Sequence, residues 1–89
     1  MKTILNAFMI TLFAISTLAA QDTQYVSEID MMLMRGNFKS VIDTCKQVLS
    51  YDSLNAEIHY KMGLAYQNIL EEDLSLASFS RAASLDPGN

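Results

Sequence analysis

The stretch from Ala56 to Asn89 decides the fold, and its large and small side chains are spaced for two packed helices: His59-x2-Met62-Gly63-x2-Tyr66, then Ser75-x3-Phe79, Ala82 and Pro87. Gly63 has no Cβ and suits the close approach of a neighbouring helix backbone. Tyr66, Phe79 and Ala82 alternate large and small groups, as interdigitated packing requires. Pro87 has no amide hydrogen and cannot continue a helix. The pattern predicts a hairpin of two antiparallel helices.

This spacing resembles the tetratricopeptide repeat, a unit of about 34 residues written aromatic-x2-Leu-Gly-x2-Tyr, small-x3-Phe, then Pro. The match over residues 56–89 needs no insertion or deletion. Two positions depart from the family, because Leu70 replaces the turn glycine and Glu72 the following aromatic residue. The sequence therefore does not predict the shape of the turn between the two helices of this hairpin. The resemblance implies an α-solenoid of stacked helix pairs that binds other proteins.

A second, degenerate copy precedes the first at residues 22–55. When residues 22–55 are aligned with residues 56–89, Ser50, Asp52 and Asn55 coincide with identical residues at the end of the later copy. We call this alignment the repeat register. Gly36 supplies the turn between the helices of the earlier copy, and Cys45 stands where the family has phenylalanine. This copy is therefore recognisable only beside the other, and together the two repeats fill the chain after residue 21.

The fold class is expected to be all-α, since no stretch alternates convincingly and no hairpin-turn dipeptide occurs. Apolar residues recur at helical spacing along the second helix, at Phe38, Val41, Ile42, Cys45, Val48 and Leu49. Gly36 suits the left-handed position that closes the first helix. Asn37 is a plausible cap of the second. Four helices are expected, at about Thr23–Arg35, Asn37 or Phe38 to Ser50, Ala56–Ile69 and Asp73–Leu85.

The segment at positions 1–20 reads as a secretory signal peptide. Lys2 precedes an apolar run from Ile4 to Ile15, and small residues follow before the polar Gln21. Cleavage after Ala20 is preferred, and after Ala19 is the second choice. The alternative is a retained membrane anchor, although the run from Ile4 to Ala20 is at the short end of what spans a bilayer. A cleaved signal peptide places the protein in the periplasm, in the cell envelope or outside the cell.

Composition limits the partners of the chain. Its 89 residues are enough for one small domain. Without residues 1–20 the chain has 5 basic and 10 acidic side chains, a net charge of −5. No basic footprint for nucleic acid is present. Contact with a membrane is expected only through an uncleaved N-terminal segment.

No constellation of residues predicts catalysis, a metal site or a cofactor. His59 is the only histidine, and it occupies an aromatic packing position of the repeat, where packing is favoured over a catalytic role. Cys45 is the only cysteine. It is expected to be a buried thiol, with a redox or intermolecular role as the alternative. One histidine and one cysteine fall short of the usual soft ligand set of a metal.

The resemblance places a partner-binding groove on the inner faces of the first helices of the two repeats. The ten candidate positions are Val26, Ser27, Asp30, Leu33, Met34, Tyr60, Lys61, Leu64, Gln67 and Asn68. The alternative is that these side chains are merely packed or solvent-facing. Val26 and Asp30 stand where family members that clamp a carboxylate have lysine and asparagine, so that activity is not implied. Met31 or Met32 is expected to fill the core, whereas Met34 faces the groove.

Two repeats leave a hydrophobic face without a following helix. Leu76, Phe79 and Ala83 are therefore expected to form an apolar edge, which is available for self-association or docking. The favoured hypothesis is an exported, non-catalytic module that binds a protein or peptide, as a scaffold or adaptor. An alternative is a sensor or docking fragment of a longer signalling or enzyme chain. A small hydrolase or redox protein using His59 or Cys45 is the least favoured.

Overall fold

The computed structural model of the chain describes residues 25–88, and every regular element in that range is an α-helix. Residues 25–35 are helical, and they are followed by α2 (Phe38–Leu49), α3 (Ala56–Asn68) and α4 (Glu72–Leu85). The expected all-α class is confirmed for this range. The expected signal peptide, the start of the first repeat and Asn89 lie outside the described residues. Within the range, no helix has the length and apolarity needed to cross a membrane.

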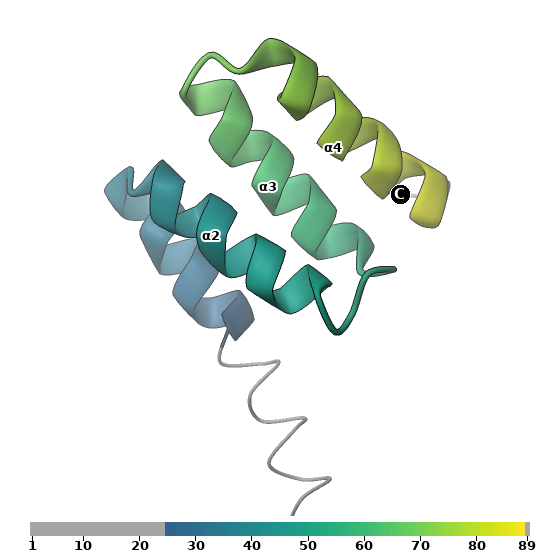
Figure 1. The fold of residues 1–89 in the computed structure, drawn as a ribbon, viewed down its shortest axis with the longest axis horizontal. Coiled ribbons are helices and arrows are strands. Elements are labelled where there is room, and N and C mark those ends of the chain that lie inside the picture. The colour runs from purple at the N-terminus through teal and green to yellow at the C-terminus, as the bar shows by residue number, and fades with distance from the viewer. Residues whose placement is uncertain (1–24, 89) are drawn as a thin grey trace, which may run out of the picture.

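The helices form two hairpins that lie side by side. Residues 25–35 and α2 make the first hairpin, and α3 and α4 make the second (Figure 1). In Figure 1, α3 lies between α2 and α4, so it packs on both. This central position of α3 explains why its buried residues lie on more than one side of the helix.

The backbone hydrogen bonds at the turn of the first hairpin recur in the second at the positions that the repeat register aligns. At the first turn the Gly36 amide donates to Leu33 O at 3.2 Å, and the Asn37 amide donates to Met32 O at 2.9 Å. At the second turn the equivalent bonds run from Leu70 to Gln67 O at 3.2 Å and from Glu71 to Tyr66 O at 2.9 Å. The paired 5→2 and 6→1 bonds are those of a Schellman motif. The turn at Leu70 therefore has the same shape as the turn at Gly36.

One apolar cluster joins the first hairpin to α3. Its buried members are Ile29, Val41, Ile42, Cys45, Val48, Ile58, Ala65 and Tyr66. Phe38 and Leu49 pack against the cluster, so all six residues of the predicted apolar face of α2 lie in or against the core. Met32 also packs there, whereas Met31 is half-exposed and Met34 is exposed. Core filling thus falls to Met32.

The helix ends follow local chemistry. Asn55 caps α3, because its side-chain oxygen accepts a hydrogen bond from the Ile58 amide at 3.1 Å. Asn37 stands at the N-cap position of α2, as expected, but its side chain makes no capping hydrogen bond. At the other end of the second hairpin, α4 stops at Leu85, shortly before Pro87. Proline ends the helix as predicted.

The contact at Gly63 differs from the expected one. A Cβ built on Gly63 would lie 2.7 Å from two carbons of the Phe79 ring, so an aromatic side chain of α4 fills this space. The expectation that a helix backbone approaches Gly63 is corrected accordingly. The Ser75 hydroxyl donates to the Gly63 carbonyl at 3.0 Å and ties the two helices together at the same place.

Candidate functional site

Lys61 and Asp30, two of the predicted groove residues, meet each other across the two hairpins. The Lys61 ammonium donates to Asp30 Oδ1 and also lies 3.2 Å from Glu57 Oε1. The lysine is buried, while both carboxylates are about half-exposed. Burial alone would lower the pKa of Lys61, but its hydrogen bonds to Asp30 and Glu57 outweigh this and raise the pKa. This cation therefore bridges the hairpins and is not free to orient a ligand.

The other predicted groove residues are dispersed over the surface and the core. Val26 and Leu33 pack against the apolar cluster, and Leu64 is partly buried. The exposed members are Ser27, Met34, Tyr60, Gln67 and Asn68. The Asn68 side chain donates to the carbonyl of Leu64, one turn earlier, at 2.8 Å. Of the ten predicted residues, Tyr60 alone lines the hollow described next.

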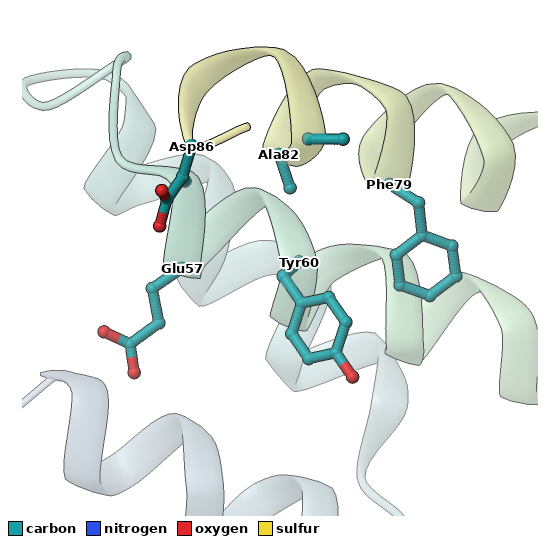
Figure 2. Close-up of a pocket in the computed structure, with 7 residues that line it drawn as sticks. Glu57, Tyr60, Phe79, Ala82 and Asp86 are labelled. Carbon is teal, nitrogen blue, oxygen red and sulfur yellow. The ribbon is translucent and has the colours of Figure 1, made fainter. Parts of the chain in front are cut away.

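An open hollow of about 880 Å³ lies between α3 and α4. It is lined by Ala56, Glu57, Tyr60, Phe79, Ala82, Ala83 and Asp86. The Tyr60 and Phe79 rings are in contact, with centroids 5.5 Å apart and planes tilted by 46°. Figure 2 shows the Glu57 and Asp86 carboxylates on one side of the Tyr60 ring and the Phe79 ring on the other. The hollow thus has an aromatic end and an acidic end.

Helical spacing brings these seven residues onto one surface. The α3 contributors lie at i, i+1 and i+4, and those of α4 lie at i, i+3, i+4 and, just past the helix end, i+7. Such positions share one face of a helix. Three of the seven are alanines, whose small side chains leave the space between the two helices unfilled. Phe79 sits at the aromatic end because the missing side chain of Gly63 leaves room for its ring.

The two carboxylates at the acidic end of the hollow, Glu57 and Asp86, have different surroundings. Glu57 has Lys61 beside it, as described above. For Asp86, the region 25–88 provides no ion pair. Its counterpart in the repeat register, Asp52, accepts a hydrogen bond from the Asn55 side chain at 3.0 Å. The counterpart of Asn55 in the register is Asn89, which lies outside the described residues, so the comparison with Asp52 places the Asp86 carboxylate at the hollow and says nothing of its donor.

The predicted apolar edge overlaps the hollow in part. Phe79 and Ala83 line the hollow, whereas Leu76 is 67% exposed and is not among its lining residues. Sequence reasoning identified the edge but missed its acidic end. The repeat register carried a signal for the apolar part of the hollow, since it aligns Phe79, Ala82 and Ala83 with residues of α2 that lie in or against the core. For the acidic end it offered only the alignment of Asp86 with Asp52.

Comparison with known proteins gives no match to this chain, whether among family models, curated proteins or solved structures. The residues and geometry of the chain itself therefore provide the evidence for its function.

Cys45 and His59, the two residues considered for a catalytic or redox role, are both held by their structural surroundings. Cys45 is fully buried, and burial raises the pKa of its thiol to about 11 despite the nearby charge of Lys61. His59 is partly buried, and its Nε2 lies 3.0 Å from the carbonyl oxygen of Ser53, where it ties α3 to the preceding loop. In the described part of the chain, no group of three or more metal-ligating side chains comes together.

The hollow can offer a ligand apolar contacts and negative charge.

Proposed function

We propose that the chain is an exported, non-catalytic module that binds another protein through an α-solenoid of two tetratricopeptide-type hairpins. The observation that carries this proposal is the open hollow between α3 and α4, where aromatic and alanine side chains lie next to two carboxylates. Protein-binding surfaces combine apolar anchors with polar groups at their margins in this way. Export is proposed from residues 1–20 alone.

The two hairpins supply a rigid support for such a surface. Tyr60 projects from the central helix, and Phe79 is held between Tyr60 and Gly63. Because both residues stand on helices, binding orders little additional chain and its entropic cost stays low. Apolar contact with the two rings would supply affinity. Since Lys61 is engaged inside the molecule, Glu57 and Asp86 are the groups placed to set orientation.

Site-specific photocrosslinking tests the proposal. The full chain is produced in its native host with a photoreactive benzophenone amino acid in place of Tyr60, and in a second experiment in place of Lys39. Lys39 is an exposed residue of α2, which α3 separates from α4 (Figure 1). We expect a discrete protein adduct from position 60 and none from position 39. Absence of an adduct at position 60, or equal labelling at both positions, contradicts the proposal.

A further inference from the structure

The face that forms the hollow on the second hairpin is covered by a helix on the first. In the repeat register, Phe79, Ala82 and Ala83 correspond to Cys45, Val48 and Leu49. The latter three pack in or against the apolar cluster that also contains Ile58 and Ala65 of α3. The chain thus shows, within itself, that this face accepts a helix. On the first hairpin that helix is α3.

Side-chain exposure at equivalent positions of the two hairpins differs, as expected for a face that no helix within residues 25–88 covers. Val26, on the first hairpin, packs against the apolar cluster. Its counterpart Tyr60 is 51% exposed. Leu49 is likewise packed, and its counterpart Ala83 is exposed. An occupant with an apolar helical face would bury the same positions on the second hairpin.

The acidic end indicates the charge of the occupant and its direction. At the first hairpin, Asp52 bonds to Asn55, the residue that begins α3. An occupant lying as α3 lies would therefore bring its N-terminal end to Asp86. The N-terminus of a helix carries partial positive charge, and a basic side chain there would add to the attraction. A second copy of this chain is disfavoured, because its net charge of −4 would face the same carboxylates.

We propose that the hollow between α3 and α4 binds a cationic amphipathic helix of another protein, with apolar side chains against Tyr60 and Phe79 and a basic N-terminal turn against Glu57 and Asp86. This deepens the proposed function and rests on it. The partner is a helix presented by a folded protein or peptide, and its lysine or arginine residues lie against the Glu57 and Asp86 carboxylates that line the hollow.

The helix α3 itself supplies the probe. Two peptides span residues 55–69: a cationic one with Asn55→Lys and Glu57→Lys, and an acidic one with Asn55→Glu that keeps Glu57. They share every other residue, so apolar contacts and helix propensity are closely matched. Binding of each fluorescently labelled peptide to the full 89-residue chain is measured by anisotropy at low salt. We expect the cationic peptide to bind about tenfold more tightly, with the difference shrinking as salt is added.

Three variants of the chain locate the binding. Asp86→Asn removes a carboxylate from the hollow, and we expect it to reduce the preference for the cationic peptide by about threefold. Asp43→Asn removes an exposed carboxylate from α2 and is the matched control, which should leave the preference unchanged. Ala83→Arg fills the hollow with a long basic side chain and should abolish binding of both peptides. Circular dichroism confirms that each variant keeps its helices.

Other outcomes overturn the inference. Equal affinity for the two peptides, or insensitivity to Asp86→Asn, excludes the cationic helix. Binding of neither peptide excludes it as well, and if the chain then sediments as a dimer that Ala83→Arg dissociates, a second copy is the occupant. Crosslinking from position 60 without binding of either peptide leaves the protein-binding function standing and removes only the cationic helix. The two proposals therefore fail in distinguishable ways.

Discussion

At the scale of single residues, Gly63 matters because the Phe79 ring lies where a Cβ of residue 63 would stand. A methyl group at Gly63 would overlap the ring, so the ring must move and give up part of its packing. We expect Gly63→Ala to lower the free energy of unfolding by about 1–3 kcal/mol, as overpacking does. Alanine's better helix propensity, about 1 kcal/mol, offsets part of this loss. Urea unfolding followed by circular dichroism measures the change.

The same substitution in a Phe79→Ala background separates the two effects. With the ring removed, Gly63→Ala has room for its methyl group and gains only the helix propensity. We therefore expect it to raise the stability of the Phe79→Ala protein. A stabilising effect of Gly63→Ala in the native background would show that the ring does not occupy the space above Gly63.

Burial of the Cys45 thiol makes the free energy of unfolding depend on pH in the alkaline range. Its pKa in the folded chain is about 11, above the ordinary value of 9.0, because burial disfavours the thiolate. A group whose folded pKa is raised contributes stability that is complete below pH 9 and is lost as the pH rises toward 11. We expect the stability difference between the native chain and Cys45→Ala to fall by about 2 kcal/mol between about pH 8 and pH 10.5. A constant difference across that range would contradict a buried, protonated thiol.

At the scale of elements, the two hairpin turns have one shape with two different residues in the left-handed position. The φ angle is 79° at Gly36 and 64° at Leu70. In residues other than glycine this conformation costs roughly 1–2 kcal/mol. The Leu70 side chain is 82% exposed, so its packing offsets little of that cost. We expect Leu70→Gly to raise the free energy of unfolding by about 1 kcal/mol. Chemical denaturation provides the measurement.

Leu70→Ala is the matched control, since it removes the same exposed side chain but keeps a Cβ. We expect little gain from it, because alanine pays a similar cost in the left-handed region. If alanine stabilises the chain as much as glycine does, exposure of the leucine side chain, and not its backbone conformation, is the source of the cost.

The helix boundaries were predictable because they depend on neighbours in sequence. Gly36, Pro87 and the apolar spacing of α2 placed three elements close to their observed bounds. The capping hydrogen bonds were harder to predict, because asparagine precedes both α2 and α3 and only Asn55 makes such a bond. Asn55 has an extended backbone with ψ 98°, and its side chain reaches the Ile58 amide. Asn37 follows a left-handed glycine, has ψ 64° and makes no such bond. That difference arises from the preceding turn.

At the scale of the whole molecule, the site was less predictable than the fold. Lys61 and Asp30 were expected to line one groove and face a ligand. In the structure they bond to each other across the two hairpins. Whether such charges face a ligand or each other depends on how the hairpins pack. The hollow likewise depends on the separation of α3 from α4, which small side chains and the Phe79 ring set together. Sequence periodicity gives the faces of helices but not the distances between them.

The bridge from Lys61 to Asp30 should couple the two hairpins. Asp30→Asn leaves the buried ammonium with Glu57 as its remaining carboxylate, and we expect it to lower the free energy of unfolding by about 1–2 kcal/mol. Lys61→Met replaces the cation by an apolar side chain of similar length and should stay within about 1 kcal/mol of the native chain, since the cost of burying a charge disappears. In the Lys61→Met background, Asp30→Asn should have no effect on stability.

Asp43→Asn again controls for loss of a surface carboxylate, and the four proteins of the double-mutant cycle are compared by urea unfolding. Because the pKa of Lys61 is raised in the folded state, the coupling should be complete below the ordinary lysine value of 10.5 and decline at higher pH as the ammonium loses its proton. If Asp30→Asn costs nothing even with Lys61 present, the apolar cluster around Ile29 and Ile58 holds the hairpins together alone. The buried lysine would then be a tolerated charge with no structural function.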